Sequence, residues 1–114
     1  MAASISAGKK DRLNRFSGVM MGTWTNSSES SDITGQTGVY GFHEGAMSYA
    51  LKEDGTAFIG KSGGGRILLD GNKSTIESAS YSTFGKGIKI DLDDNLLDIK
   101  NGHGGIRFDN SDKL

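Results

Sequence analysis

The sequence contains no cysteine and no proline, and only 34% of its 114 residues are hydrophobic. Without cysteine the chain can form no disulfide, no thiol nucleophile and no thiolate zinc site. The lack of proline fits a backbone whose amide groups form hydrogen bonds along most of its length. A chain with so little apolar material has difficulty closing a core alone, so we expect it to need a partner subunit.

An excess of charge of one sign is also missing. Thirteen Lys and Arg residues stand against fourteen Asp and Glu residues, and the isoelectric point is near 6.1. This balance argues against disorder and provides no basic surface for nucleic acid. No apolar run reaches the length of about 18 residues that would predict membrane insertion. The first ten residues also lack the apolar stretch of a signal peptide.

The sequence does have abundant glycine, with 18 residues, and short stretches of alternating apolar and polar side chains. Residues 1–14 are small and polar and predict a lead-in, whereas residues 15–114 predict a region of β-hairpin repeats. In the first predicted strand, Phe16, Met20 and Trp24 share one face. No segment of the chain predicts a helix.

The hairpin pattern repeats along the chain. Residues 47–51 alternate in polarity and are followed by Asp54-Gly55, a strong hairpin signal, and by a return strand at 56–59. Three later segments share a glycine, a basic residue among apolar ones and a closing aspartate: 65–70, 87–91 and 105–109. This degenerate repeat predicts an elongated, quasi-one-dimensional β architecture. We expect its corners at Gly55, Gly71 and Gly85.

Each predicted hairpin offers only two or three inward apolar side chains, and an isolated hairpin is marginally stable in water. Three copies wound around one axis would share a core and pair their edges. We therefore predict an all-β fold in which short hairpins form an intertwined trimeric β-helix or β-prism-like fibre. The alternative is a single-chain β-sandwich or β-solenoid. The predicted trimer core consists of Ile67, Leu69, Ile76, Ile88, Ile90, Leu92, Leu97 and Ile99.

Residues 38–73, which read GVYGFHEGAMSYALKEDGTAFIGKSGGGRILLDGNK, carry a resemblance to a known family. They are similar to segments of tail-fibre and baseplate-associated tail proteins of bacteriophages and prophages of Gram-positive hosts. Residues 14–24 and 88–94 resemble the same family, so the likeness extends over about residues 14–109. The pattern breaks off inside a hairpin after Asp109, which suggests a fragment of a longer protein.

The resemblance implies a homotrimeric, fibrous β structure in a virion tail, placed near the end that contacts the host. It implies a structural role without catalysis. The partners it implies are further copies of the chain, other tail or baseplate proteins and, at the host, a cell-surface glycan. It carries no catalytic residues over to this sequence.

Several motifs could suggest chemistry, but none predicts a catalytic, cofactor or metal site. Residues 55–62 match the phosphate-binding pattern GxxxxGKS, yet the glycines that follow cannot begin the helix that such a loop requires. Residues 91–95 are rich in Asp but lack the spacing of a calcium loop, so we predict a solvated turn. His43 and His103 stand apart from any nucleophile and are interpreted as surface or turn residues.

Two other functions remain open from the sequence. The chain could be a carbohydrate-binding module, with Trp24, Tyr40 and Tyr49 as the candidate contacts to a host-surface glycan. It could also be part of a glycan-cleaving tail spike, which would need two carboxylates about 5 to 10 Å apart in a groove. Saturable glycan binding would identify a carbohydrate-binding module, and release of reducing ends from a glycan would identify a glycan-cleaving tail spike.

Overall fold

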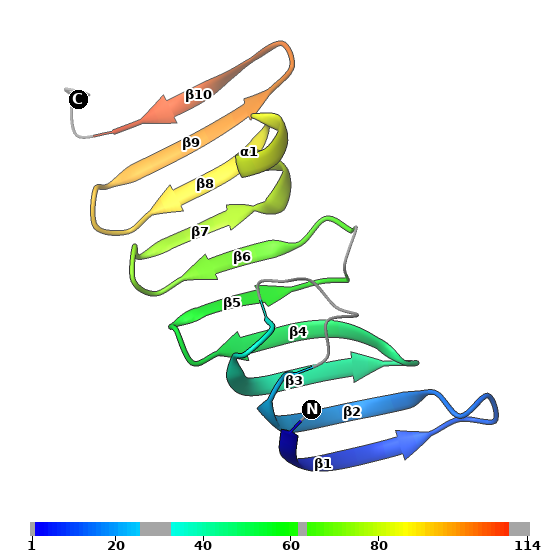
Figure 1. Ribbon diagram of the computed structural model, residues 1–114. Helices are drawn as coiled ribbons and strands as arrows, with labels where there is room; N and C mark the ends of the chain where they lie inside the picture. The colour runs from blue at the N-terminus through cyan, green and yellow to red at the C-terminus, as the bar shows by residue number, and fades with distance from the viewer. Residues whose placement is uncertain (1, 26–32, 62–63, 110–114) are drawn as a thin grey trace.

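The computed structural model describes residues 2–25, 33–61 and 64–109, in which ten strands form one open antiparallel sheet (Figure 1). Each strand pairs with the strands that precede and follow it in the chain, and the sheet extends over 55 × 27 × 21 Å. The elements are β1 (Ala2–Lys10), β2 (Phe16–Thr23), β3 (Thr37–His43), β4 (Ala46–Lys52), β5 (Thr56–Ile59), β6 (Ile67–Asp70), β7 (Thr75–Ser78), α1 (Ala79–Phe84), β8 (Gly87–Asp91), β9 (Leu96–Asn101) and β10 (Gly104–Phe108).

The all-β class is confirmed, and the described residues form one open sheet in place of the two packed sheets of a sandwich or the coils of a solenoid. A sandwich or a solenoid needs strands that leave one sheet and join another. Here the strand order in the single sheet is the order along the chain, and every neighbouring pair is antiparallel. The segment around Gly105 does not open a new hairpin, since β10 pairs with β9 as its return strand.

Residues 2–10, expected to belong to a polar lead-in, form the edge strand β1. This strand has few large side chains, so its sequence lacks the alternation that reveals a strand. Its pairing with β2 depends on close backbone approach instead. Gly8 lies opposite Gly18, and a Cβ atom added at Gly8 would come within 2.3 Å of the Ser17 carbonyl oxygen. Small residues therefore specify the strand where apolar periodicity does not.

A second difference from the sequence expectation is the six-residue helix α1, which follows β7 directly. The segment was too short and too polar to show a helical period. Gly85 ends the helix in the left-handed conformation, with φ of 66°. The predicted corner at Gly85 is therefore the end of a helix. The helix lies beside β7 and β8 on one side of the sheet (Figure 1).

The turns share a simple chemistry. After β6 and after β8, the side chain of the closing aspartate accepts hydrogen bonds from the backbone two and three residues further on: Asp70 from Asn72 and Lys73, Asp91 from Asp93 and Asp94. The expected hairpin at Gly55 is confirmed, with φ of 86° there. At the expected corner of Gly71, the left-handed residue is Ser74, with φ of 56°.

The hydrophobic core is small and lies in the N-terminal half of the sheet. Its buried members, among the described residues, are Trp24, Ile33, Tyr40, Met47, Ala50 and Phe58. The Trp24 ring is 5.6 Å from the ring of Tyr40 and 5.9 Å from that of Phe42. Phe16 also contacts Phe42, and Met20 lies opposite Tyr40, so the predicted shared face of Phe16, Met20 and Trp24 is confirmed. We call this side of the sheet the core face.

Candidate functional site

The opposite side of the sheet carries an uninterrupted row of apolar side chains across all ten strands. Residues directly opposed on neighbouring antiparallel strands point to the same face, so the register of the ten strands places one row along the whole sheet. The row consists of Ile5, Met21, Val39, Leu51, Ala57, Leu69, Ile76, Ile90, Leu97 and Phe108. A chance alternation would be interrupted by polar residues within a few strands.

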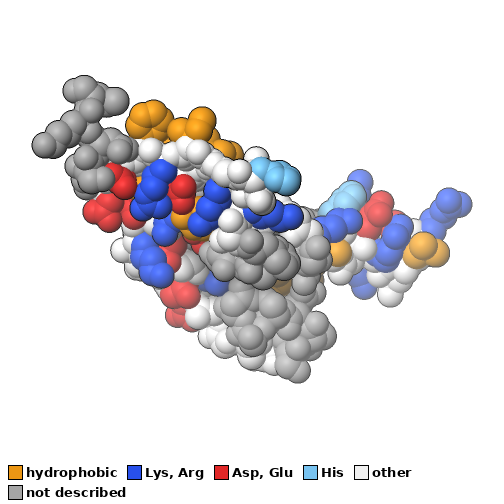
Figure 2. Space-filling model, turned by 90° about the horizontal axis from the view of Figure 1, so that it is seen from above, with side chains coloured by type: hydrophobic (Ala, Val, Ile, Leu, Met, Phe, Trp, Pro, Cys, Tyr) orange, Lys and Arg blue, Asp and Glu red, His pale blue; other side chains and the backbone are white. Residues whose placement is uncertain are grey.

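A second row runs parallel to the first, two residues away on each strand. Its apolar and small members are Ala7, Val19, Gly41, Tyr49, Ile59, Ile67, Ile88, Ile99 and Ile106, with Ser78 as the polar member beside Ile67. We call the surface made by the two rows the apolar face. Figure 2, which looks from the β10 end, shows hydrophobic side chains along one edge of the nearer part of the molecule, with charged side chains beside them.

The apolar face is uncovered in this chain. Ten of its large side chains are between 36% and 69% exposed, including Ile59, Ile88 and Ile106. With ten strands about 4.8 Å apart and two rows about 6.8 Å apart along each strand, the face covers on the order of 650 Å². A typical stable interface buries about this area on each partner. Monomeric proteins seldom expose an apolar patch of this size, so the face has the properties of an interaction surface.

The structure brings most of the predicted trimer-core residues together on the apolar face. Seven of them lie in its two rows: Ile67, Leu69, Ile76, Ile88, Ile90, Leu97 and Ile99. Leu92 lies just beyond β8, in the turn that leads to β9, and is 61% exposed. These residues build no core within one chain, because no second layer covers them. The sequence identified the set but not its continuation over β1 to β5.

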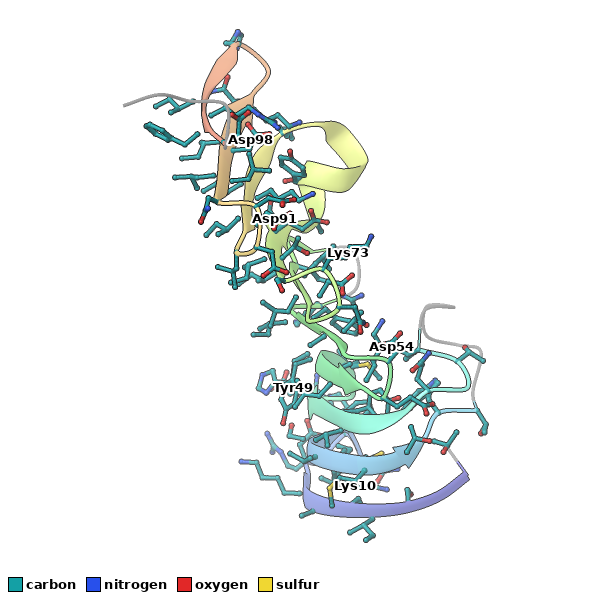
Figure 3. All side chains as sticks on the ribbon, turned by 90° about the vertical axis from the view of Figure 1, so that its left-hand side faces the viewer. Lys10, Tyr49, Asp54, Lys73, Asp91 and Asp98 are labelled. Atoms are coloured by element: carbon teal, nitrogen blue, oxygen red, sulfur yellow. The ribbon has the colours of Figure 1, made fainter. Side chains whose placement is uncertain are left out.

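The three aromatic residues expected to contact a glycan are separated by the sheet. Trp24 and Tyr40 are buried on the core face, so neither ring presents a surface on which a sugar could stack. The hydroxyl of Tyr40 donates a hydrogen bond to the backbone carbonyl of Gln36. Tyr49 projects from the other side, where it belongs to the apolar face (Figure 3). The three side chains therefore form no common binding surface.

On the core face, the row that begins with buried residues ends in alternating charges. Leu68 lies opposite Glu77, which is opposite Lys89; the row continues through Asp98 to Arg107. Each acidic side chain in this charged row thus has a basic neighbour on the next strand. Opposed charges on one sheet face contribute roughly 0.2 to 1 kcal/mol per pair, less where water screens them. Electrostatic pairing replaces hydrophobic burial over β7 to β10.

Asp98 is the centre of this charged row and is buried. It accepts hydrogen bonds from the Tyr81 hydroxyl at 2.6 Å and from Arg107 Nη1 at 3.2 Å, and Lys100 Nζ is 3.9 Å away. Its hydrogen bond with Tyr81 is the main cause that raises the pKa of that phenol, followed by desolvation. The Lys100 ammonium also lies 4.2 Å from the centre of the Tyr81 ring. Helix α1 is therefore attached to the sheet through Tyr81.

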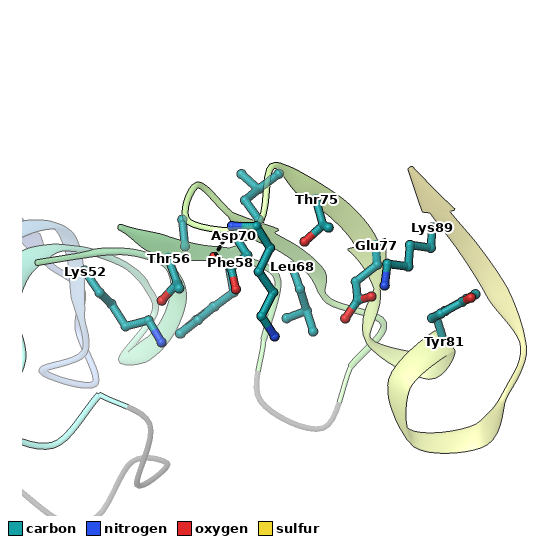
Figure 4. Close-up of a pocket in the computed structure, with 12 residues that line it drawn as sticks. Lys52, Thr56, Phe58, Leu68, Asp70, Thr75, Glu77, Tyr81 and Lys89 are labelled. Carbon is teal, nitrogen blue, oxygen red and sulfur yellow. Dashed lines mark hydrogen bonds between the residues drawn. The ribbon is translucent and has the colours of Figure 1, made fainter. Parts of the chain in front are cut away.

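A groove of about 530 Å³ lies on the core face between the hydrophobic core and Tyr81 (Figure 4). Its basic side chains are Lys52, Lys73 and Lys89, and its acidic ones are Asp70 and Glu77. Two aromatic residues line it, but cations already lie over their rings: Arg66 is 3.8 Å from the ring centre of Phe58, and Lys100 covers Tyr81. The groove therefore offers charge and hydrogen bonds more than a free aromatic platform. Sequence reasoning missed it, because its residues come from five separate segments.

The motifs that suggested other chemistry have local structural roles. Residues 56–59 of the GxxxxGKS motif are strand β5, whereas Ser62 lies outside the described residues. Asp91 accepts backbone hydrogen bonds in its turn. His43 is exposed beside Glu44 in the β3–β4 hairpin, and His103 occupies the β9–β10 turn. Over residues 2–25, 33–61 and 64–109, no three His, Cys, Asp or Glu side chains are grouped to hold a metal ion.

In the part of the chain that the structure describes, no helix is long and apolar enough to span a membrane. Comparisons with protein-family models, with curated proteins and with solved structures found no match. The apolar face, the charged row and the groove are therefore the features from which a function must be argued.

Proposed function

We propose that this chain is a structural segment of a phage tail fibre or baseplate-associated protein, in which three copies assemble through their apolar faces into a stiff shaft. The observation that carries the proposal is the apolar row from Ile5 to Phe108, which crosses all ten strands without a polar residue. A surface that must bind one localised partner has no need of such continuity along 55 Å. Copies arranged side by side along the long axis use all of it.

The composition of the two faces supports burial of one and exposure of the other. Neither of the two rows of the apolar face contains a charged side chain, so burial of this face between copies leaves no charge unpaired. The core face carries the charged row and the groove, which are suited to contact with water. In the proposed shaft the apolar faces point to the common axis, and the charged row points outward.

The role assigned here is mechanical. Paired backbones and a shared apolar axis make an elongated body that resists bending and proteolysis, and that carries a part of the virion which contacts the host. The segment itself has no catalytic role in this proposal. Its partners are two further copies of the same chain and the neighbouring tail or baseplate proteins, and its location is the virion tail.

The test is the mass of the species in solution, measured by native mass spectrometry and by size exclusion with light scattering. The proposal expects three times 12.1 kDa, or multiples of that mass where trimers also join end to end, and an oligomer that resists heat and mild detergent. Ile90→Asp places a carboxylate in the middle of the apolar row and is expected to abolish side-by-side assembly into the trimer. Thr34→Asp is the matched control, since it adds the same charge at an exposed site outside the sheet.

The possible masses have different consequences. A dimer would retain self-association through the apolar face but would contradict the three-sided shaft. A stable monomer with the apolar face open to water would overturn the proposal. A trimer formed by Ile90→Asp at the concentration where the wild type forms one would show that the apolar face is not the interface.

A second candidate function is binding of an acidic glycan at the host surface, and the groove is the observation that favours it. Lys52, Lys73 and Lys89 bring three ammonium groups to one depression beside the hydroxyls of Thr56 and Thr75 (Figure 4). Titration calorimetry with an acidic polysaccharide tests this function. Binding that saturates and is lost in Lys73→Glu would support it, whereas equal heats for both proteins would contradict it.

A further inference from the structure

The two outer strands of the sheet, β1 and β10, each pair with one neighbour in the described structure. A strand edge of this kind presents a row of backbone N–H and C=O groups to which another strand can pair. Natural edges are commonly blocked by proline or by inward-pointing charge. Neither edge contains a proline; the basic residues are Lys9 and Lys10 at the end of β1 and Arg107 in β10, and the rest of the nine-residue strand β1 is uncharged.

The directions of the two edge strands are compatible with pairing between copies. Because all neighbours in the sheet are antiparallel, odd-numbered strands run one way and even-numbered strands the other. If a second copy continues the sheet beyond β10, its β1 is antiparallel to that strand. It takes the place of an eleventh strand, with the copy turned about the long axis by the accumulated twist of the sheet.

The side chains match in the same register. With Phe108 opposite Ile5 of the next copy, Ile106 lies opposite Ala7, and both apolar rows continue across the junction. On the core face, the same register places Arg107 opposite Ser6 and Gly105 opposite Gly8, so no like charges or bulky pairs meet. A slip by one residue would move Phe108 and Ile106 to the wrong face.

We propose that the edge of β10 binds the edge of β1 of a second copy, head to tail, by strand addition in this register. Such an interface is heterologous and does not close on itself, so it generates an open series of 12.1 kDa units. The inference goes beyond the proposed function, because it uses the two ends of the sheet and not the apolar face. In a shaft of side-by-side copies it extends the length of the rod.

Disulfide trapping tests the register directly, since the native chain has no cysteine. In Ser6→Cys/Arg107→Cys, the two thiols of one chain lie nine strand spacings apart, about 43 Å, and cannot react with each other. Opposed positions on adjoining copies have Cβ atoms about 5 Å apart, within reach of disulfide formation. Mild oxidation is expected to yield a ladder of linked species on a non-reducing gel that collapses on reduction.

The control is Ala7→Cys/Arg107→Cys, in which the first cysteine lies on the other face of the strand. It is expected to give at least fivefold less ladder than Ser6→Cys/Arg107→Cys. Equal ladders from the two pairs would overturn the proposed register. Absence of a ladder from both variants, at concentrations where the wild-type protein associates, would overturn strand addition itself.

A charge test avoids cysteine altogether. Ser6→Glu places a carboxylate opposite Arg107 of the next copy and is expected to strengthen end-to-end association roughly two- to fivefold, whereas Ser6→Arg weakens it by a similar factor. Thr34→Glu and Thr34→Arg change the net charge equally at a site away from both edges. Analytical sedimentation measures the association of each variant. Equal changes in association from the substitutions at positions 6 and 34 would contradict the proposal.

The failure of this inference can be told apart from failure of the proposed function. Ile90→Asp acts on the apolar face and leaves both edges unchanged, so the disulfide ladder is expected to persist in that background. A trimer without a ladder rejects only the end-to-end contact. A ladder without a trimer rejects only the side-by-side shaft.

Discussion

The ring of Tyr49 lies directly on Gly41, its partner across the β3–β4 strand pair. A Cβ atom added at Gly41 would come within 1.9 Å of Tyr49 Cε1, so the glycine leaves the space that the ring occupies. An aromatic side chain placed over a cross-strand glycine covers backbone that would otherwise face water. The pair interrupts the aliphatic part of the apolar face without exposing polar groups.

This contact predicts strong coupling between the two positions. Gly41→Ala is expected to displace the Tyr49 ring and lower the free energy of unfolding by about 1 to 3 kcal/mol. In a Tyr49→Ala background the same substitution meets empty space and is expected to cost much less. A double-mutant cycle measured by urea denaturation gives the coupling energy. Equal costs in the two backgrounds would show that the ring does not occupy this position.

The Tyr81 hydroxyl predicts a pH dependence on the alkaline side. Its hydrogen bond to Asp98 raises the pKa of Tyr81 above the ordinary value of 10.0. A group whose pKa rises on folding stabilises fully below its unfolded pKa and loses that effect as the pH increases through its folded pKa. The stability of the wild type is therefore expected to fall above about pH 10.

Tyr81→Phe is expected to lower stability at neutral pH by less than about 1 kcal/mol, since the site is partly exposed. The substitution also removes the part of the loss of stability at alkaline pH that comes from ionisation of Tyr81. Burial also raises the pKa of Tyr40, with smaller contributions from Glu53 and Asp54, so some alkaline loss persists in the variant. Thermal unfolding from pH 7 to 11 measures the difference between the two proteins. A difference that stays constant with pH would contradict the assigned hydrogen bond.

The β3–β4 hairpin predicts a matched pair of glycine substitutions. Glu44 and Gly45 both have positive φ, 48° and 84°, as a two-residue turn of type I′ requires. Gly45→Ala meets no atom closer than 3.6 Å, so its cost is conformational and is expected to be about 1 to 2 kcal/mol. Gly65→Ala, at an open position without positive φ, is expected to change stability by less than about 0.5 kcal/mol. The melting temperatures of the two variants, each compared with that of the wild type, test whether Gly45→Ala costs more stability than Gly65→Ala.

The sequence predicts the hairpins well where side-chain alternation and turn residues agree. Residues 56–59 were expected as a return strand and 65–70 as part of the next hairpin, and the structure has β5 at Thr56–Ile59 and β6 at Ile67–Asp70. The signal is physical, since alternate residues on a strand point to opposite faces and Asp residues accept backbone hydrogen bonds in turns. The same reasoning fails at β1, where small residues specify pairing by close backbone approach.

The candidate site was predictable only in part. Apolar residues of β6 to β9 were assigned to one face, but the row across the whole sheet depends on register, which local patterns do not provide. Charge alternation such as Glu77, Lys89 and Asp98 becomes visible only once the strands are aligned. Trp24 and Tyr40 were expected to contact a glycan, because a sequence does not show which aromatic residues become buried.

The two halves of the sheet predict different local stability in the unassembled chain. All six buried core residues come from positions 24 to 58, whereas β7 to β10 have apolar side chains on an uncovered face and charges on the other. Backbone hydrogen bonds without buried apolar contacts open readily. In Ile90→Asp, in which the apolar faces are expected to stay apart, amides of β3 and β4 are expected to exchange at least tenfold more slowly than those of β8 and β9.

Assembly reverses this difference, because burial of Ile88, Ile90, Leu97 and Ile99 between copies gives β8 and β9 the core that they lack alone. Hydrogen exchange followed by mass spectrometry on the wild-type oligomer is therefore expected to show protection in both halves. Thr34→Asp serves as the assembled control with the same added charge. Uniform protection in Ile90→Asp would mean that the charged row around Asp98 stabilises β7 to β10 as well as a hydrophobic core does. Folding of this half of the sheet would then not depend on a second copy.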